Sequence, residues 1–483
     1  MLNNIEPKAL WDHFSALNAI PRASKKEAQI IQFMLDFGAS LQLQTTKDAV
    51  GNVIIKKPAT IGMEARPTLV LQSHLDMVHQ KNADTQFDFA TQGIDMFIDG
   101  DWVRARGTTL GADNGIGVAT IMALLSSTEI QHPAIEALFT IDEETGMTGA
   151  MGLEAGVLNG NILLNLDTED DRELCIGCAG GIDVSGVGKY TAEAVPGNWK
   201  TYTLTVNGLT GGHSGMDIHL GRANANKLMT RTLKEIQKTI AFRLVKFDGG
   251  SLRNAIPREA VAVIAIPASE SNILANIINR LAGIFKIENL LTDPQLLLSL
   301  KEAEETSHCL PAAFTKNLIG ALYTIPNGIY RMTPGIDGLV QSSNNLARVL
   351  VQNETYEIHC LCRSSVDSEK LDLAEMIVSA LEFLNGETQT KGEYPGWAPL
   401  PNSAIVKMMQ HQYEEMFNEK PHVNAVHAGL ECGILGINYP QMQMISFGPN
   451  IRGAHSPDEC VQISSVQKFW KYFLEVIANI KEA

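Results

Sequence analysis

The sequence predicts an α/β protein of two domains, in which the second domain is inserted into the first. Three observations lead to this fold class. The chain has 483 residues, more than one hydrophobic core usually serves. Short apolar strands alternate with helical patterns in its first third. From about residue 186 the pattern changes to longer alternating strands and amphipathic helices, and after about residue 393 the first pattern returns.

The first third of the chain is predicted to form a mostly parallel sheet. Three short apolar runs, each ending at a polar residue, are expected to be buried strands: TLVLQSH (68–74), IEALFTI (135–141) and NILLNL (161–166). Between the first two, residues 114–127 have the length and apolar content of a helix. Strands that alternate with helices are typical of parallel α/β sheets.

The middle of the chain is predicted to be a separate α+β domain with helices on one face of a sheet. Its expected elements are a strand in 200–212, a helix in 223–240, a strand in 258–268, a helix in 271–285 and a strand in 355–365. The resulting boundaries give residues 1–185 and 394–483 to the first domain and residues 186–393 to the second.

Composition and charge exclude several classes of partner and compartment. A net charge of −16 repels phosphate backbones and anionic lipid, so neither nucleic acid nor a membrane is expected as a partner. The N-terminus lacks the continuous apolar core of a secretory signal. The seven cysteines are odd in number and thinly spread, which indicates a reducing compartment, and we expect a cytoplasmic protein. Cys175 and Cys178 have C-x-x-C spacing without a second such pair, so zinc or redox chemistry there is the less favoured alternative.

Residues that can bind metals gather where the predicted strands end. The first strand is followed by Asp76 after its last residue His74, the second by Glu143 and Glu144, and the third by Asp167. Open α/β sheets carry their sites beyond the carboxyl ends of their strands. Imidazoles and carboxylates without cysteine suit zinc, cobalt or manganese.

Two further motifs carry one candidate each. Asp113 lies between glycines in LGADNG just before the predicted helix, and His455 lies in GAHSPDE after a late strand. A carboxylate that bridges two cations about 3.5–4 Å apart is the usual core of two-metal hydrolytic sites, and Asp113 is the candidate bridge. Each residue alone is compatible with a solvated turn, so only the joint pattern favours a metal site.

Six motifs together resemble those of one metallopeptidase family. They are SHLDMV, GTTLGADNGIGVA, IDEETGMTGA, NLDTED, GGHSGMDIH and GAHSPDE. The set is similar to that of the co-catalytic zinc aminopeptidases and dipeptidases, a family with carboxypeptidase G-type and deacylase members. The longer segment GGHSGMDIHLGRANAN most resembles the Xaa-His (aminoacyl-histidine) dipeptidases. The resemblance covers nearly the whole chain, and implies a mixed-sheet α/β catalytic domain, an inserted α+β lid domain and a homodimer formed through the lid.

The resemblance also implies roles for the residues at the strand ends. Two divalent cations per chain, zinc with cobalt or manganese as alternatives, are expected on His74, Asp113 and Asp167 and on Asp113, Glu144 and His455. Glu143 is then the general base, which takes a proton from the attacking water and returns it to the leaving amine. Asp76 is expected to orient the imidazole of His74. A cis peptide is expected between Asp113 and Asn114.

Asp142, Glu143 and Glu144 form a run of carboxylates that repel one another unless cations reverse the local charge. Successive side chains at a strand end point to different sides. One glutamate is therefore expected to bind metal while its neighbour faces the substrate water. Asp142 has no such role and is expected to be a surface turn residue.

The middle domain supplies candidates for substrate binding. His213 in GGHSG resembles the lid histidine that stabilises the developing oxyanion, and His219 in the same loop is an alternative. Asn254 and Arg363 resemble positions that hold the substrate backbone and its carboxylate, since a guanidinium donates two parallel hydrogen bonds. A structural salt bridge is the alternative for Arg363. Glu431 is expected to be solvated, with contact to a free α-amine as the alternative.

These expectations combine into a dinuclear metal-dependent dipeptidase for unblocked, carnosine-like Xaa-His dipeptides. Alternatives are a tripeptidase or an N-acyl amino acid deacylase with the same metals, or a non-catalytic metal-dependent binding protein. The presence of Glu143 beside every expected ligand favours an enzyme, because binding alone does not need a base.

Overall fold

The computed structural model describes residue 2 and residues 5–480, which divide into two compact units. Unit 1 contains Met1–Gly177, Trp397–Ala425 and Leu430–Ala483, and unit 2 contains Cys178–Gly396 and Val426–Gly429. The boundary expected at residue 185 falls inside strand β9 (Gly180–Lys189). The chain passes from β8 (Glu173–Cys178) into β9 with no helix between them to mark the change.

Unit 1 is built on an eight-stranded mixed sheet in the order β1-β2-β6-β3-β7-β23-β8-β22. Its other strands are β1 (Gln44–Lys47), β2 (Val53–Lys57), β3 (Leu69–His74), β6 (Ile135–Thr140), β7 (Ile162–Asn165), β22 (His422–Val426) and β23 (Gln443–Ser446). The central strands β6, β3, β7 and β23 run parallel, while β1, β2 and β8 pair antiparallel with their neighbours. The predicted mixed sheet and its three predicted strands are therefore confirmed.

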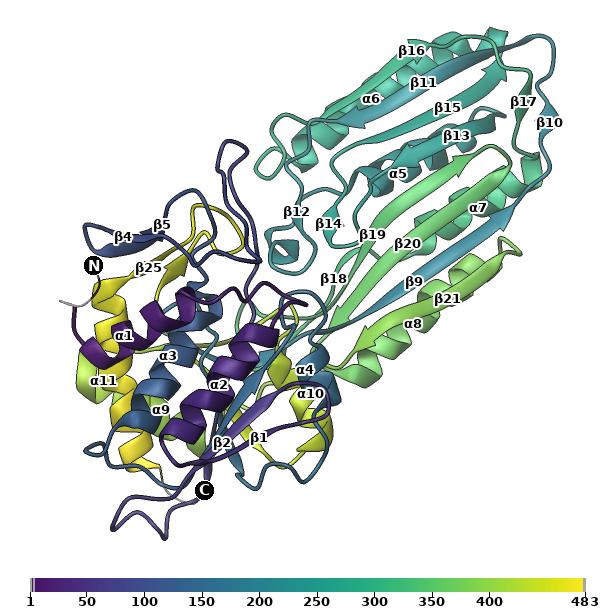
Figure 1. The fold of residues 1–483 in the computed structure, drawn as a ribbon. Helices are drawn as coiled ribbons and strands as arrows, with labels where there is room; N and C mark the ends of the chain where they lie inside the picture. Colours follow the sequence, from purple (N-terminus) through teal and green to yellow (C-terminus); the bar gives the residue numbers. More distant parts are fainter. Residues whose placement is uncertain (1, 3–4, 481–483) are drawn as a thin grey trace. The chain divides into compact units, whose positions relative to one another are not determined.

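Helices and a four-stranded sheet complete unit 1 (Figure 1). The helices are α1 (Lys8–Asn18), α2 (Ala28–Ser40), α3 (Ala112–Ser126), α4 (Thr148–Gly152), α9 (Ala404–Phe417), α10 (Glu431–Asn438) and α11 (Ile463–Asn479). The small sheet contains β4 (Met96–Asp99), β5 (Trp102–Ala105), β24 (Ile451–Arg452) and β25 (Cys460–Gln462). Helix α3 contacts α1 and β3 and is apolar on all sides, as expected of a fully buried helix. Among the described residues, no helix combines the length and apolar character that a membrane span requires.

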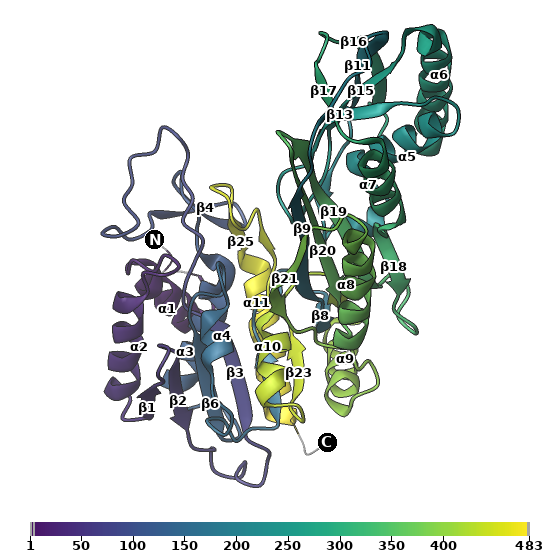
Figure 2. The same cartoon turned by 90° about the vertical axis from the view of Figure 1, so that its right-hand side faces the viewer.

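Unit 2 is built on a nine-stranded antiparallel sheet in the order β16-β11-β15-β13-β19-β20-β9-β21, with β18 paired to β19. The other strands of this sheet are β11 (Trp199–Asn207), β13 (Arg243–Gly249), β15 (Ala260–Pro267), β16 (Leu297–Glu302), β18 (Gly328–Met332), β19 (Val340–Gln352), β20 (Thr355–Ser364) and β21 (Glu387–Tyr394). Unit 2 also contains two separate two-stranded sheets, β10 (Glu193–Ala194) with β17 (His308–Cys309) and β12 (Gly212–His213) with β14 (Ala255–Ile256). Its helices are α5 (Ala225–Gln237), α6 (Ser271–Glu288), α7 (Ala312–Thr324) and α8 (Asp367–Glu382), with short 3₁₀ turns η1 (Ile218–Leu220) and η2 (Ala268–Glu270). Figure 2 shows α5 to α8 on one face of this sheet, as predicted for an α+β domain. One continuous apolar core lies between these helices and the sheet.

Candidate metal centre and substrate-binding groups

The parallel strands bring the predicted ligands to one edge of the sheet in unit 1. Strand β3 pairs in parallel with both β6 and β7, and its last residue His74 lies opposite Thr140 at the end of β6. The turn at 143–144 follows β6, and Asp167 follows β7. Ligands from three strand ends therefore converge because the strands share one direction.

Asp113 is shared by two groups of metal-binding side chains. Its Oδ1 lies 3.1 Å from Nε2 of His74, and its Oδ2 lies 3.3 Å from Nε2 of His455. Oδ1 of Asp167 is 3.5 Å from Nε2 of His74, and Oε2 of Glu144 is 3.0 Å from Nε2 of His455. Both three-residue groups expected from the sequence are thus brought together, with Asp113 between them.

The spacing of these atoms fits a metal ion in each group. Ligand atoms about 2.0–2.2 Å from a tetrahedral zinc ion lie about 3.3–3.6 Å from one another. The four nitrogen–oxygen distances are 3.0–3.5 Å. Oε1 of Glu144 is buried and has no hydrogen-bond partner among the described residues, so it has capacity to bind a cation. Three protein ligands in each group leave a position for water or substrate, as in catalytic sites.

The backbone near Asp113 and His455 has two uncommon conformations. The peptide bond between Asp113 and Asn114 is cis, as the family resemblance implied. His455 has a left-handed backbone with a φ of 64°. A non-glycine residue with a left-handed backbone, such as His455, is held in it by the surrounding structure, and such residues cluster at functional sites.

The carboxylates and imidazoles shift one another's pKa. Burial lowers the pKa of His74, but the nearby carboxylates of Asp167 and Asp113 outweigh it and raise the pKa well above its ordinary value. Hydrogen bonds to Asp113 and Glu144 raise the pKa of His455 to about 11. Burial raises the pKa of Asp167 to about 7. Because a metal ligand must be deprotonated, cation binding to these residues is expected to release protons and to strengthen as pH rises.

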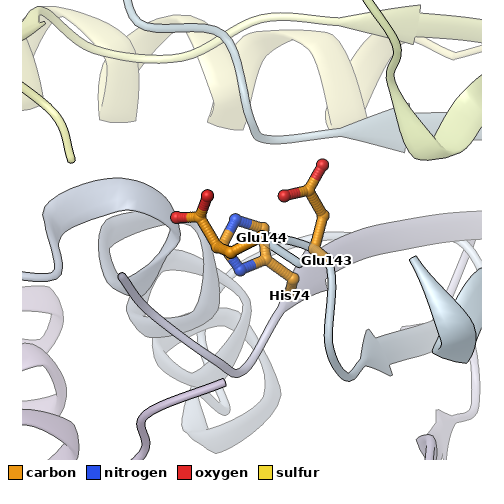
Figure 3. A group of neighbouring side chains, drawn as sticks. All are labelled: His74, Glu143 and Glu144. Atoms are coloured by element: carbon orange, nitrogen blue, oxygen red, sulfur yellow. The ribbon is translucent and has the colours of Figure 1, made fainter. Parts of the chain in front are cut away.

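Glu143 and Glu144 lie in the turn after β6, with their carboxyl groups on the same side (Figure 3). With His74 they form a third group whose ligand atoms lie within 4.8 Å of one another. The expectation that the two glutamates point to different sides was wrong, because the alternation of a strand ends where the turn begins. His74 and Glu144 belong to different cation groups, so the carboxylate of Glu143 lies beside both. Burial raises the pKa of Glu143 well above its ordinary value, which suits a proton acceptor.

Asp76 is hydrogen-bonded to the glutamate turn and lies against His74. Its carboxylate accepts hydrogen bonds from the backbone N–H groups of Glu143 at 3.0 Å and Glu144 at 3.3 Å, and from Oγ of Ser24 at 2.8 Å. Nδ1 of His74 lies 3.5 Å from Oδ1 of Asp76 and 3.1 Å from its backbone oxygen. A carboxylate in this position can hold the imidazole with Nε2 directed at a metal.

Two acidic residues expected at the surface are buried. Asp142 is 3% exposed, has a φ of 55° and accepts a hydrogen bond from Oγ1 of Thr148 at 2.8 Å, so it closes the turn. Glu431 is 1% exposed and accepts hydrogen bonds from Nε2 of Gln72 at 2.6 Å and Oγ1 of Thr140 at 2.7 Å. The expectation that Asp142 and Glu431 are exposed was wrong, because a polar stretch of sequence does not show which distant segments will cover it.

Three buried residues were not identified from the sequence: Arg22 and Glu459 beside the candidate metal-binding groups, and His427 in unit 2. Arg22 donates hydrogen bonds to the backbone oxygens of Leu75 at 3.1 Å and Asp76 at 3.2 Å. Glu459 is the last residue of GAHSPDE, and His427 is the first residue of HAGLECG. The sequence feature that could have identified Glu459 and His427 is their position in these glycine-containing motifs.

Unit 2 has its own polar cluster, gathered around Gly215. A Cβ atom at Gly215 would lie 2.3 Å from the backbone oxygen of His427 and 3.2 Å from Nε of Arg363. The same Cβ would lie 3.2 Å from Cε1 of His213. Oγ of Ser343 lies 2.7 Å from Nε2 of His427. The glycine therefore leaves room for the side chains of Arg363 and His213 and for the backbone of His427 to lie close together.

Arg363 is a buried cation without a carboxylate partner. It is 5% exposed, its Nη1 donates to the hydroxyl of Tyr394 at 2.9 Å, and its Nε is buried without a hydrogen-bond partner. Across the described part of the chain, no ion pair includes Arg363. Burial and the charge of Arg363 lower the pKa of His427 to about 3, so that imidazole is neutral. A buried guanidinium in these surroundings favours an anionic ligand over the salt-bridge alternative.

His213 is held as a neutral imidazole with its proton on Nε2. The backbone N–H groups of Gly215 and Met216 donate to Nδ1 at 3.2 and 3.0 Å, so Nδ1 must be the acceptor. Burial and the nearby charge of Arg363 lower the pKa of His213. A neutral Nε2–H is a suitable hydrogen-bond donor for a developing oxyanion.

Asn254 and His219 are less closely integrated into this cluster. The backbone oxygen of Asn254 accepts a hydrogen bond from Ser214 at 2.8 Å, next to the pairing of β12 with β14, but its side chain is exposed. The side chain of His219 is exposed in η1. Of the four candidates in unit 2, the structure thus brings His213 and Arg363 together.

The chain is similar to known proteins over nearly its whole length. The model of "Peptidase family M20/M25/M40" matches residues 70–479. The chain is 43% identical over 479 residues to the cytosol non-specific dipeptidase of Escherichia coli (strain K12), covering 99% of each chain. The crystal structure of aminoacylhistidine dipeptidase from Vibrio alginolyticus matches with a TM-score of 0.96 and 43% identity, over 100% of this chain and 99% of that one. Aminopeptidase PepT from Bacillus cereus ATCC 10987 shares the fold, with a TM-score of 0.57 and 14% identity over 99% of each chain. The chain therefore belongs to peptidase family M20/M25/M40.

Proposed function

We propose that this protein is a dinuclear metal-dependent dipeptidase that hydrolyses unblocked dipeptides, with Xaa-His dipeptides as its substrate class. The observation that carries the proposal is the position of Asp113, whose two oxygens face His74 and His455 in separate three-residue groups. The names of the two relatives that are 43% identical to the chain, a non-specific dipeptidase and an aminoacylhistidine dipeptidase, support the substrate class.

Two divalent cations per chain are proposed, one in each group that contains Asp113. The first group is His74, Asp113 and Asp167, and the second is Asp113, Glu144 and His455. Zinc suits these nitrogen and oxygen ligands, and cobalt or manganese would use the same set. When bound, the cations would polarise the scissile carbonyl and lower the pKa of water.

The side chains of unit 1 supply proton transfer. Glu143 takes a proton from the attacking water and returns it to the leaving amine. Asp76 keeps His74 and the turn of Glu143 in place through the hydrogen bonds and contacts described above. Two observations support Glu143 as the base: its raised pKa and its place beside both groups.

Side chains of unit 2 are proposed to bind the substrate. Nε2–H of His213 donates to the oxyanion that forms on the scissile carbonyl, with His219 as the alternative donor. Arg363 pairs with the free carboxylate of the dipeptide, and Asn254 bonds its backbone. Support comes from the neutral tautomer of His213 and from the unpaired Nε of Arg363.

We also propose a cytoplasmic homodimer formed through unit 2. Three large apolar side chains of unit 2 are well exposed on α8 and β18 or beside them: Phe383 at 71%, Tyr330 at 46% and Met332 at 42%. Such side chains are suited to an interface between subunits. The cytoplasmic assignment is supported by the seven buried cysteines and by the cytosolic relative. Analytical ultracentrifugation tests the dimer, and a mass of one chain would contradict it.

A substrate panel with and without chelator tests the proposed activity. The panel contains β-alanyl-histidine, α-aminoacyl-histidine dipeptides, tripeptides and N-acetylated amino acids. We expect hydrolysis of the Xaa-His dipeptides, loss of activity with chelator and recovery when zinc is returned. Faster cleavage of tripeptides or N-acetylated amino acids would identify the alternative activities. Metal binding without any hydrolysis would identify a binding protein and contradict the proposal.

A further inference from the structure

Glu459 accepts hydrogen bonds from four consecutive backbone N–H groups at the start of α3. Its Oε2 accepts from Leu110 at 2.7 Å and Gly111 at 2.8 Å, and its Oε1 accepts from Ala112 at 2.7 Å and Asp113 at 3.2 Å. The side chain is buried, with 2% of its surface exposed. Both oxygens of one carboxylate thus hold the backbone of the segment that ends at Asp113.

Helix α3 alone cannot hold this segment. The first N–H groups of a helix have no acceptor inside the helix, and Asp113 itself is non-helical, with φ −80° and ψ 111°. Gly111 has a φ of 70°, which turns successive N–H groups toward one point and forms a concave anion site. A carboxylate at a helix N-terminus is also stabilised by the helix dipole. Without Glu459, these buried N–H groups would lose their acceptor, and the backbone of Asp113 would no longer be fixed.

Glu459 also belongs to the loop that carries His455. This loop, residues 453–459, connects β24 to β25. Within it, the backbone N–H of Glu459 donates to the oxygen of Ser456 at 3.1 Å. One side chain therefore joins the backbone of Asp113 to the loop of His455, and the side chains of Asp113 and His455 meet at 3.3 Å.

Arg22 binds the same segment, residues 110–113, at a backbone carbonyl oxygen. Its Nη2 donates to the backbone oxygen of Gly111, while Nη1 donates to the oxygens of Leu75 and Asp76. Arg22 thereby connects the segment before Asp113 to the segment that follows β3. Arg22 and Glu459 thus bind the same short stretch of backbone, Arg22 at the carbonyl oxygen of Gly111 and Glu459 at its N–H groups.

We propose that Glu459 is a positioning residue of the metal centre. It fixes Asp113 and His455 relative to each other, and so strengthens binding of the cation that both residues share with Glu144. This inference rests on the dinuclear site proposed above. Groups that orient metal ligands from outside typically contribute about 10- to 100-fold in metal affinity, and a comparable effect is expected here.

The test compares Glu459→Gln with a matched variant, Glu136→Gln. Glu136 is also buried, at 3% exposed, and its carboxylate also accepts backbone N–H groups, from Asn159 at 2.7 Å and Gly160 at 3.0 Å. It lies near the opposite end of β6 from the metal ligands, about 13 Å along the strand. Glutamine keeps the size of the side chain but turns one acceptor into a donor that faces other donors. Both variants are therefore expected to lower Tm.

The stepwise affinities for Zn²⁺ are measured by competition with a chromophoric chelator, using the metal-free full chain. We expect Glu459→Gln to bind one cation about 10- to 100-fold more weakly and Glu136→Gln to match the wild type. Unchanged affinities in folded Glu459→Gln, with the same loss of Tm as in Glu136→Gln, would overturn the proposal. Binding of fewer than two cations by the wild type would instead contradict the dinuclear site.

Amide hydrogen exchange of the wild type tests the same inference without a variant. In metal-free protein, the amides of residues 110–113 are expected to be protected, because Glu459 rather than a cation holds them. Exchange of these amides at the rate of an exposed loop would overturn the inference, even if Glu459→Gln fails to fold.

Discussion

The polar clusters of unit 1 and unit 2 differ in the sign of their charge. In unit 1, carboxylates surround His74 and His455, and their negative charge raises the pKa of both imidazoles. In unit 2, the buried guanidinium of Arg363 lies near His213 and His427, and its positive charge contributes to the lowering of both pKa values. Carboxylates thus surround the histidines of unit 1, which is an environment suited to divalent cations, whereas the histidines of unit 2 are held as neutral hydrogen-bond donors or acceptors.

The difference suggests how a small charged substrate is recognised. An acidic cluster without cations would repel the carboxylate of a dipeptide, whereas two dications reverse that field and favour a polarised carbonyl. A buried arginine without a counter-ion favours the carboxylate itself. We therefore propose that the cluster of unit 1 binds cations and that the cluster of unit 2 binds the charged end of the substrate.

The largest effect on turnover is expected from Glu143→Gln. The amide keeps the volume of the side chain but cannot accept the proton of the attacking water. General base catalysis is typically worth about 10² to 10⁴ in rate, so kcat should fall at least that far while metal content stays unchanged. Steady-state kinetics and elemental analysis on one preparation provide the measurement. Loss of metal in Glu143→Gln would reassign Glu143 as a ligand.

His213→Ala is expected to have the next largest effect, a fall in kcat of about 10²- to 10³-fold. The cause is loss of the Nε2–H donor, which the hydrogen bonds of Gly215 and Met216 to Nδ1 define. Because the donor acts on the oxyanion, KM should change much less than kcat. A greater fall in His219→Ala than in His213→Ala would transfer this role to His219.

Arg363→Ala should lower kcat/KM for free dipeptides by about 10- to 100-fold, the range for hydrogen bonds to a charged group. C-terminally amidated dipeptides lack the carboxylate and should be affected far less. Arg363→Lys should restore part of the activity, since it returns the charge without the planar fork. Equal losses on free and amidated substrates would indicate a structural role for Arg363.

The smallest effect is expected from Ser343→Ala, which removes the hydroxyl partner of His427. Because His427 lies near Arg363, which we propose to bind the substrate carboxylate, and because one hydrogen bond contributes about 1 kcal/mol, or about fivefold in an equilibrium, KM for free dipeptides should rise by at most a factor of that order. The metal content should not change, because Ser343 is in neither three-residue group of metal-binding side chains that contains Asp113. A change in metal content would show that Ser343 supports a metal ligand.

Local sequence patterns predicted the parts of the fold that depend on local chemistry. Strands β3, β6 and β7 are short apolar runs that end at polar residues, and parallel pairing then places those ends together. This reasoning predicted that His74 and Asp167 lie close together. It also predicted that Glu144 lies near them, although the turn after β6 directs the side chains of both Glu143 and Glu144 to one side.

Contacts between distant segments could not be predicted in this way. Glu459 and the N–H of Leu110 are 349 residues apart in sequence, so no local pattern reports their hydrogen bond. The burial of Asp142 and Glu431 likewise depends on which segments cover the end of the sheet. Charged residues inside glycine-containing motifs, as in GAHSPDE and HAGLECG, remain the best local indication of such contacts.

Metal content of two aspartate variants tests the central claim, that one carboxylate serves two cations. Asp167 belongs to one group and Asp113 to both, so their removal should differ in stoichiometry. We predict that elemental analysis after loading and desalting will find about two metals per chain in the wild type, about one in Asp167→Ala and almost none in Asp113→Ala. Two metals in folded Asp113→Ala, or equal losses in both variants, would contradict a shared bridging ligand.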